Sequence, residues 1–310
     1  MNNSSKDVCI VGGGMGSLSA AIYLNKKGFH VVLVSSGAIA QGMKIWKLDS
    51  KPKSIDFLQA LSAAGQIGLI NSYQKELKRF DLITAQVLLS HSDFKVKKRS
   101  ENAKKSISNL INLGAIPIIN ENDVVSTEEI KFGDNDNLAS MIANLVDADL
   151  LIILTDQKGM YDKNPDSYKD AKLINRIDIE DLKNFDSDFS TQSEIGTGGF
   201  ITKIQAAKRA ALSNTYTVIA NGLEKNILDN IFVNDNTGTL FIPSEKKISA
   251  KIMVDGSIKH AQTEGSIHKV AATILGAESC NGWTYWHCEL GNTFVPIDNL
   301  RQKFLSKNYL

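Results

Sequence analysis

Cysteine is scarce in this chain. The 310 residues include only Cys9, Cys280 and Cys288, which are too few and too widely spaced for a disulfide framework. This usage is typical of a reducing compartment, so we expect a cytoplasmic protein. The spacing of Cys280 and Cys288 with His268 and His287 fits no common zinc finger, and we predict no metal site.

Long apolar runs and an excess of one charge are also missing. No stretch approaches the roughly 20 residues that span a bilayer, so we expect no membrane partner. The start, Met1–Asp7, lacks the long apolar region of a signal peptide. The net charge of +1 does not mark the whole chain as a nucleic-acid binder. The length fits two or three domains, or one large α/β domain with an appendage.

A GxxxxGK[ST] loop is absent, which excludes a P-loop enzyme by sequence. What the chain has is an alternation of short apolar strands and amphipathic helices. This alternation predicts an α/β fold, a three-layer αβα sandwich with a mainly parallel sheet. Strands are expected at Val8–Val11, His30–Val34, Leu82–Leu89, Ile116–Asn120, Leu150–Leu154 and Thr217–Ala220. Helices are expected at Ser17–Lys27, Ser54–Arg79, Ser100–Leu113, Asn137–Leu145 and Lys203–Ser213.

Polar and glycine-rich clusters stand at the ends of several of these elements. In α/β sheets, ligands bind at the carboxyl ends of the strands. One such cluster is usually only a turn, but four in succession predict a ligand site. They are Ser35–Ala40, Asn120–Asp123, Thr155–Gly159 and Gly196–Lys203.

Residues 35–250 resemble glutamate 5-kinases, a branch of the amino-acid kinase family. The specific strings are Ile119–Leu138, which contains Asn120–Asp123 and Gly133–Asn137, and Leu154–Gly159. The resemblance implies the sandwich of that family over residues 1–250. It also implies transfer of the γ-phosphoryl group of ATP to the side-chain carboxylate of L-glutamate, the first step of proline biosynthesis. A homo-oligomer is expected from the resemblance, since the residues alone do not specify an oligomeric state.

The same resemblance implies roles for single residues. A glutamate carboxylate is already ionised at neutral pH, so catalysis needs positioning and charge neutralisation rather than a general base. Lys203 would neutralise the transferring phosphoryl group and Asp136 would orient that lysine, while Mg²⁺ would arrive on ATP. Ser36, Asp123 and Asn135 would hold glutamate. The nucleotide would lie at Thr155, Asp156, Thr197, Gly198, Gly199, Phe200, Ile201, Thr202 and Lys203.

Simpler interpretations of these residues stay open. Asp123 and Asp136 could be helix caps or loop residues, and Lys203 could be a solvated helix residue. The family also carries a lysine in its first strand, where this chain has Ile10. This departure leaves open whether turnover is impaired.

The front of the chain resembles the start of a flavin-dependent oxidoreductase. Gly12 and Gly14 fit the dinucleotide fingerprint, but its third glycine falls on Ser17. The acidic residue that would bind a ribose is absent, because the second strand ends at Val34 and continues with serine. Binding of FAD or NAD is therefore one alternative; the other is that this segment only supplies a β-α-β unit to the kinase sheet.

Residues 251–310 are expected to form a separate small module. Gly265–Ala272, Cys280–His287 and Pro296–Arg301 resemble the C-terminal, DNA-contacting part of cell-cycle-type adenine-specific DNA methyltransferases. The catalytic Asp-Pro-Pro-Tyr motif of those enzymes is absent, which excludes methylation. DNA contact by a non-catalytic protein remains an alternative.

The aromatic residues of this module admit a second interpretation. Trp283, Tyr285 and Trp286 could contact bases, or they could form a small aromatic core. We favour the core.

Overall fold

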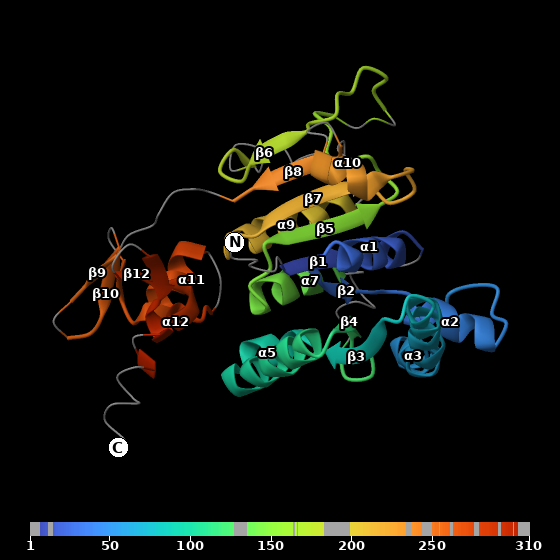
Figure 1. Ribbon diagram of the computed structural model, residues 1–310, viewed down its shortest axis with the longest axis horizontal. Coiled ribbons are helices and arrows are strands. Elements are labelled where there is room, and N and C mark those ends of the chain that lie inside the picture. Colours follow the sequence, from blue (N-terminus) through green and yellow to red (C-terminus); the bar gives the residue numbers. More distant parts are fainter. Residues whose placement is uncertain are drawn as a thin grey trace. The chain divides into compact units, whose positions relative to one another are not determined.

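The computed structural model divides the chain into two compact units, Met1–Ser244 and Glu245–Leu310. Both units are drawn in Figure 1. The structure describes residues 7–11, 15–126, 135–163, 165, 167–182, 199–233, 237–243, 250–253, 255–260, 263–275, 279–290, 293–299 and 301–302.

The first unit is built on an eight-stranded sheet with the strand order β3-β4-β2-β1-β5-β7-β8-β6. The pairs from β3 to β7 are parallel, β8 runs antiparallel to β7, and β6 is parallel to β8. The expected mainly parallel sheet is therefore confirmed. The strands are β1 (Asp7–Val11), β2 (His30–Val34), β3 (Ile83–Leu89), β4 (Ala115–Glu121), β5 (Leu150–Thr155), β6 (Arg176–Asp178), β7 (Tyr216–Asn221) and β8 (Thr239–Ile242).

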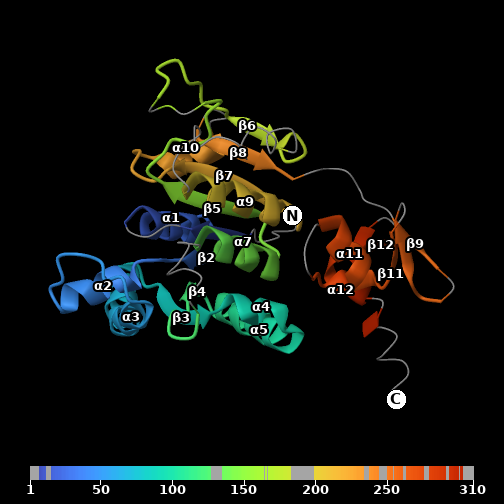
Figure 2. The same cartoon turned by 180° about the vertical axis from the view of Figure 1, so that it is seen from behind.

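Helices cover both faces of this sheet, as Figures 1 and 2 show from opposite sides. Side chains of α5, α7 and α9 pack on one face, and side chains of α1, α3 and α10 pack on the other. The three-layer sandwich predicted from the sequence is thus confirmed. The helices are α1 (Met15–Lys26), α2 (Ala38–Ile45), α3 (Ile55–Lys78), α4 (His91–Lys95), α5 (Lys97–Asn112), α7 (Asn135–Leu145), α9 (Gly199–Ala211) and α10 (Ile227–Val233).

Strand β2 shows why the sheet is buried on both faces. Val32 and Val34 belong to the core under α7, whereas Val31 and Leu33 belong to the core under α1. Successive side chains of a strand point to opposite faces, so a continuous apolar run fills both layers. A strand buried in this way must lie inside the sheet, between other strands.

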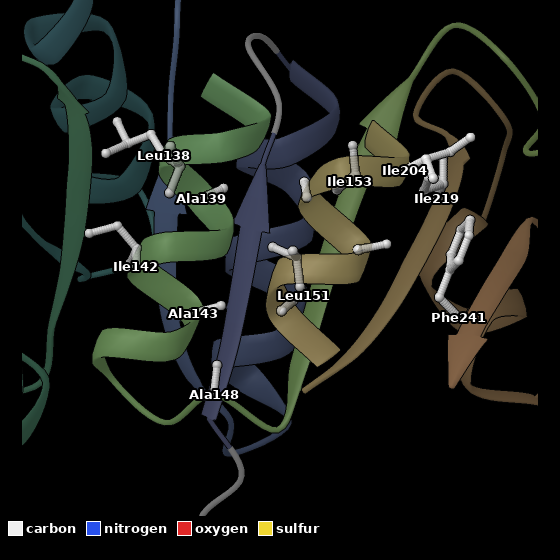
Figure 3. Close-up of a cluster of buried hydrophobic side chains, with 14 of the residues drawn as sticks. Leu138, Ala139, Ile142, Ala143, Ala148, Leu151, Ile153, Ile204, Ile219 and Phe241 are labelled. Carbon is white, nitrogen blue, oxygen red and sulfur yellow. The ribbon is translucent and has the colours of Figure 1, made fainter. Parts of the chain in front are cut away.

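Helix α7 lies close against the sheet because its facing side chains include small ones. Leu138, Ala139, Ile142 and Ala143 recur at the spacing of one helix face and are all fully buried. Figure 3 shows this row beside β1 and α9. The packing fixes the N-terminal end of α7, where Asn135 and Asp136 stand.

Helices α2 and α3 approach each other through two glycines. A Cβ atom on Gly42 would lie 2.0 Å from the carbonyl oxygen of Leu61, and one on Gly65 would lie 1.9 Å from that of Ala38. No larger residue fits at either position without moving a backbone. Helix α2 begins after Gly37, whose φ of 100° is a left-handed conformation that favours glycine.

The second unit is small and made of short elements. Ile258, Val270, Ala271 and Trp286 form its buried core. The Nε1 atom of Trp286 donates a hydrogen bond to the carbonyl oxygen of Ile267 at 3.0 Å. The elements are β9 (Lys251–Ile252), β10 (Ile258–His260), β11 (Thr263–Gly265), α11 (Ile267–Leu275), α12 (Gly282–Tyr285), β12 (His287–Leu290) and β13 (Thr293–Pro296).

The aromatic side chains of this unit have different environments. Trp286 is 8% exposed and lies in the core, and Tyr285 packs edge-on against it at 5.0 Å between ring centroids. Trp283 is only half-buried and lies under the guanidinium group of Arg301, 4.8 Å from its ring centroid. The predicted aromatic core therefore includes Trp286 and Tyr285 but not Trp283. Across the described ranges, no helix is both long and apolar enough to cross a bilayer.

Candidate functional site

Three of the four polar clusters predicted from the sequence follow parallel strands. Ser35 and Ser36 come directly after β2, Asp123 comes two residues after β4, and Asp156 comes directly after β5. Strands β4, β2, β1 and β5 are neighbours that run in the same direction. Their carboxyl ends consequently lie along one edge of the sheet, which is where such folds bind ligands.

Asp123 is a buried carboxylate with one engaged oxygen. Its residue is 4% exposed, and its Oδ2 atom accepts a hydrogen bond from the hydroxyl of Ser62 on α3 at 2.5 Å. Its Oδ1 atom is buried and has no hydrogen-bond partner among the residues that the structure describes. A buried acceptor without a donor is costly, and a cationic ligand would satisfy it.

The environment of Asp123 changes its ionisation. Burial, the largest influence, raises the pKa of Asp123 above its ordinary value, and the nearby charge of Glu121 raises it further. The hydrogen bond from Ser62 and the charge of Lys51 act in the opposite direction. An ammonium group placed against this carboxylate would favour its ionised form.

A row of polar side chains on α3 faces this end of β4. Gln59, Ser62 and Gln66 are spaced three and four residues apart, which places them on one helix face. The Nε2 atom of Gln59 lies 2.7 Å from the carbonyl oxygen of Asp123, and the Oε1 atom of Gln66 accepts from Asn120 at 2.9 Å. No role was predicted for this row from the sequence, although the spacing of its residues is typical of one helix face.

Asn135, the first residue of α7, is tied to the end of β2. Its Nδ2 atom donates to the carbonyl oxygen of Ser35 at 3.0 Å. The backbone N–H of Ser35 donates in turn to Ile119 of β4 at 2.8 Å, and the Ser35 hydroxyl lies 2.9 Å from that of Tyr73. The structure thus brings the segment of Ser36 and the residue Asn135 together.

Asp136, the next residue, pairs with α9 instead. The Nζ atom of Lys203 lies 2.9 Å from Oδ2 of Asp136, and the hydroxyl of Thr202 donates to the same oxygen at 2.9 Å. The side chains of Lys203 and Asp136 are 17% and 11% exposed. This pair argues against a freely solvated Lys203.

Thr155 and Asp156 continue β5 at the same edge of the sheet. The hydroxyl of Thr155 donates to Oδ1 of Asp156 at 3.0 Å. Strand β7 supports both residues, because Asn221 donates to the carbonyl oxygen of Asp156 and the N–H of Gly222 donates to that of Thr155. Hydrogen bonds to β7 hold this predicted nucleotide segment in place.

The remaining predicted nucleotide residues lie at or before the start of α9. Thr197 and Gly198 lie outside the described residues, and Gly199 begins the helix. Phe200 is 6% exposed and packs in the core, whereas Ile201 is 44% exposed. The first turn of α9 carries no acidic residue of its own, which suits an anion at the positive end of the helix dipole.

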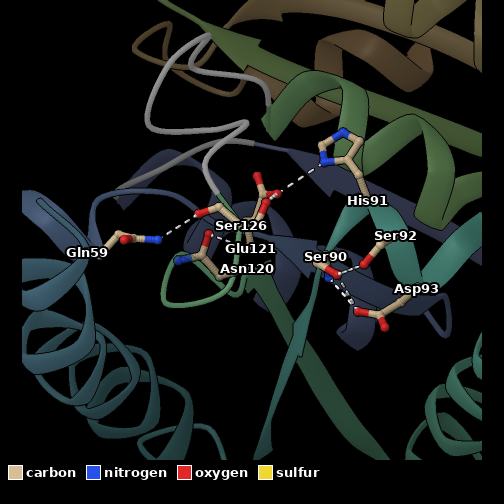
Figure 4. Close-up of polar contacts among 8 residues, drawn as sticks. All are labelled: Gln59, Ser90, His91, Ser92, Asp93, Asn120, Glu121 and Ser126. Carbon is tan, nitrogen blue, oxygen red and sulfur yellow. Dashed lines mark hydrogen bonds and ion pairs between the residues drawn. The ribbon is translucent and has the colours of Figure 1, made fainter. Parts of the chain in front are cut away.

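Glu121 and His91 were not assigned a role from the sequence. Figure 4 shows Glu121 between His91 and Ser126. The Nδ1 atom of His91 lies 3.1 Å from Oε1 of Glu121, and the hydroxyl of Ser126 donates to the same oxygen. Glu121 stood in the string Asn120–Asp123, but the sequence did not indicate its partner His91, which is the first residue of α4.

The described part of the chain contains no preformed cluster of metal-binding side chains. Within it, no group of three or more histidine, cysteine, aspartate or glutamate side chains is placed to hold a metal ion. Cys280 and Cys288 are free thiols. A Mg²⁺ ion that arrives on a nucleotide needs only one or two protein carboxylates, and Asp136 and Asp156 are the described candidates beside α9 and β7.

Sequence profiles match both parts of the chain. The profile described as "Amino acid kinase family" matches residues 5–221, and the profile "Restriction Enzyme Adenine Methylase Associated" matches residues 225–310. The kinase match includes the segment at the start of the chain that resembles a flavoprotein. These comparisons do not support the flavoprotein resemblance. The second match partly fits the expected methyltransferase-like tail.

Curated relatives match about three quarters of the chain and extend beyond the matched region. The chain is 41% identical to a glutamate 5-kinase of Marinomonas sp. over 257 residues, covering 78% of this chain and 69% of the relative. It is 45% identical to a glutamate 5-kinase of Methylococcus capsulatus over 228 residues, covering 74% and 61%. The chain therefore spans about two thirds of the length of these relatives.

A solved structure has the same fold as the first unit. A carbamate kinase from Giardia lamblia bound to AMP-PNP superposes with a TM-score of 0.53 at 16% identity, covering 77% of this chain and 99% of that one. At this identity the likeness concerns the fold alone, and it confirms the expected sandwich of amino-acid kinase type.

Proposed function

The chain belongs to the amino acid kinase family, and from that premise we propose that it phosphorylates the side-chain carboxylate of L-glutamate with ATP. The first unit is glutamate 5-kinase-like, which makes the protein a phosphotransferase with a carboxyl group as acceptor. The product is an acyl phosphate, glutamyl 5-phosphate, and the other product is ADP.

The pair of adjacent residues at the start of α7 carries this proposal. Asn135 bonds to the segment after β2, and Asp136 bonds to Lys203 of α9. One rigid helix end therefore links the proposed glutamate side of the site to the proposed phosphate side. Such fixed spacing is the main requirement of phosphoryl transfer to a nucleophile that is already ionised.

On the glutamate side, charge complementarity supports the proposed contacts. Asp123 offers a buried acceptor to the ammonium group of glutamate. Ser36 and Asn135, which stand beside the end of β2, can donate hydrogen bonds to carboxylate oxygens. The side-chain carboxylate then faces the γ-phosphorus atom, so that one of its oxygens forms the new P–O bond as ADP leaves.

On the phosphate side, Lys203 supplies positive charge and Asp136 holds that lysine in place. The backbone N–H groups at the start of α9, together with Thr197 and Gly198, which precede it in the sequence, would cradle the phosphates. Thr155 and Asp156 would line the nucleotide site beside β7. Mg²⁺ would come bound to ATP and neutralise phosphate charge there.

A coupled assay of ADP release with glutamate and Mg-ATP tests the function. Glutamate-dependent release is expected, together with an acyl phosphate that hydroxylamine traps as a hydroxamate. N-acetylglutamate, which lacks the ammonium group, is the matched control and is expected to be a poor acceptor because Asp123 then has no cation to bind. The proposal would be contradicted if the parent protein released ADP in the presence of glutamate no faster than a Lys203→Ala variant does.

The first strand bears on the rate of this reaction. Ile10 stands in β1, paired with Leu33 of β2 and Ile152 of β5, where the family carries a lysine. We propose that the missing charge slows turnover, so an Ile10→Lys variant is expected to raise kcat. The proposed location in the cytoplasm and the homo-oligomeric state remain predictions.

The second unit has a separate candidate role. The methylase-associated match over residues 225–310 favours DNA as a ligand of this part of the chain. Retention on DNA that weakens steeply with salt is the expected result, since phosphate contacts release counterions. Absence of retention at low salt would rule this role out.

A further inference from the structure

Residues 122–126, here called the substrate loop, follow β4 and contain Asp123, the proposed ammonium-binding carboxylate. The loop begins with Asn122, whose N–H donates to Leu89 of β3 at 2.9 Å. It closes with the N–H groups of Val125 and Ser126, which both donate to the carbonyl oxygen of Asn122 at 3.0 Å. Asp123 lies inside this tight turn, so the position of its carboxylate depends on what holds the loop.

One anchor of the substrate loop comes from α3. The Nε2 atom of Gln59 lies 2.7 Å from the carbonyl oxygen of Asp123, 3.2 Å from that of Val124 and 3.4 Å from that of Ser126. A single side-chain amide thus gathers three carbonyl groups of the loop. This anchor restrains the side of the loop that faces α3.

A second anchor lies on the other side of the loop. The side chain of Glu121 is fully buried, at 0% exposure, and its Oε1 atom accepts from the hydroxyl of Ser126. The Nδ1 atom of His91, whose side chain is 15% exposed, lies 3.1 Å from the same oxygen. A buried carboxylate is stable only when donors surround it, so the two donors and Glu121 hold one another.

His91 is itself fixed by the first turn of α4. Asp93 accepts hydrogen bonds from both the backbone N–H and the hydroxyl of Ser90, each at 2.8 Å. Figure 4 shows this clamp beside His91 and Glu121. His91 is the first residue of α4, so the clamp sets where its ring stands.

We propose that His91 and Glu121 are positioning residues for substrate binding: together they hold the substrate loop so that Asp123 meets the amino group of the acceptor. Neither side chain contacts the substrate. The chain of contacts runs from the end of β3 through His91, Glu121 and Ser126 to the loop that carries Asp123. This inference rests on the proposed function, because it assigns Asp123 to the acceptor.

Steady-state kinetics of His91→Leu and Glu121→Leu test the assignment. Each removes one side of the contact, and each is expected to raise KM for glutamate about 10-fold while KM for ATP and kcat stay within about threefold. Glu121→Gln retains an oxygen that can accept from Ser126 and His91, so it is expected to keep KM for glutamate within about threefold. Such rescue by a same-shaped side chain would not follow from a requirement for bulk alone.

Ser92→Ala is the matched control. Ser92 neighbours His91 on α4 and bonds to the hydroxyl of Ser90, but none of its described contacts reaches Glu121. Its kinetic constants are expected to equal those of the parent protein. A glutamate KM that is unchanged in both leucine variants would overturn the proposal, and so would equal losses in KM for ATP, KM for glutamate and kcat.

Hydrogen exchange of the substrate loop tests the positioning role of His91 without a measurement of enzyme activity. The amides of Asn122, Val125 and Ser126 are hydrogen-bonded, and in His91→Leu they are expected to exchange about 10-fold faster than in Ser92→Ala. Unchanged exchange would refute the positioning role. If the parent protein does not use glutamate, the proposed function fails, while the exchange experiment still shows whether His91 holds the loop.

Discussion

The Nζ atom of Lys203 and the Oδ2 atom of Asp136 lie 2.9 Å apart in a contact that joins α9 to α7. Both side chains are mostly buried, and removal of either partner of a buried ion pair leaves the other without compensation. The contact also keeps the long lysine side chain from sampling many rotamers. The charge of Lys203 is therefore held at a fixed place before any substrate binds.

Removal of this charge should slow the chemical step. Lys203→Ala is expected to lower kcat about 100-fold to 1,000-fold, because a fixed donor no longer neutralises the transferring phosphoryl group. The measurement is ADP release at saturating glutamate and Mg-ATP. Lys208→Ala, a change farther along the same helix, is the control and should leave kcat within about twofold. An equal loss in both variants would point to damage of α9 rather than to a role of Lys203.

The affinity for glutamate should depend on pH because of Asp123. Burial raises the pKa of this carboxyl, so it takes up its proton at a higher pH than an ordinary aspartate does. The ionised form binds the ammonium group, and KM for glutamate is therefore expected to rise as the pH falls towards the ordinary aspartate range. KM for ATP, measured over the same pH series, serves as the comparison and should change less.

The same raised pKa predicts the effect of Asp123→Asn on stability. A carboxyl with a raised pKa binds its proton more tightly in the folded state, so ionisation of Asp123 reduces the free energy of unfolding at neutral pH. Asp123→Asn is expected to weaken glutamate binding about 10-fold or more without lowering the urea midpoint at neutral pH. A variant that both unfolds earlier and binds glutamate normally would contradict this account.

Two glycines of α3 should respond in opposite ways to alanine. A Cβ atom on Gly65 would lie 1.9 Å from the carbonyl oxygen of Ala38, so Gly65→Ala is expected to cost about 3 kcal/mol of unfolding free energy. A Cβ atom on Gly68 would come no closer than 4.0 Å to Gln41, and alanine favours helix by about 1 kcal/mol. Gly68→Ala should therefore be neutral or stabilising in urea unfolding.

The thiol of Cys280 should be slow to react. Burial raises the pKa of Cys280 to about 11, which leaves little thiolate at mildly alkaline pH. Alkylation by iodoacetamide at about pH 8 is expected to be roughly 100-fold slower than for an unperturbed thiol. Peptide-resolved mass spectrometry follows the site, and the same reaction in urea should proceed at the ordinary rate. Fast labelling of the folded protein would mean that the thiol is accessible.

The long elements of the first unit could be predicted because each buries a continuous apolar pattern. His30–Val34 is an example, since its run of apolar residues allows no other place than the inside of a sheet. Short elements such as α4 and β6 gave no such signal, because three to five residues contain too little periodicity. Helix α9 begins at Gly199, whereas the sequence predicted a start at Lys203. The earlier start was missed because consecutive glycines are not a typical signal for the first turn of a helix.

From the sequence alone, the site could be predicted only as a set of polar residues that follow the ends of strands. Asp123 and Asn135 could be named from the string in which they stand, but Gln59 and His91 could not. Gln59 reaches the substrate loop from α3 across 64 residues of chain, and His91 reaches Glu121 from α4 across 30 residues. Sequence spacing describes neighbours within one element, whereas these contacts exist only after the elements pack.

Strand β1 occupies the middle of the sheet, between β2 and β5, although it is the first strand of the chain. Its partner Leu150 follows Val8 by more than a hundred residues. During synthesis, one edge of β1 must therefore wait unpaired until β5 has left the ribosome, a delay of about ten seconds or more. An unpaired apolar strand edge can pair with the wrong partner. This protein is therefore expected to depend on chaperones more than its size alone would suggest.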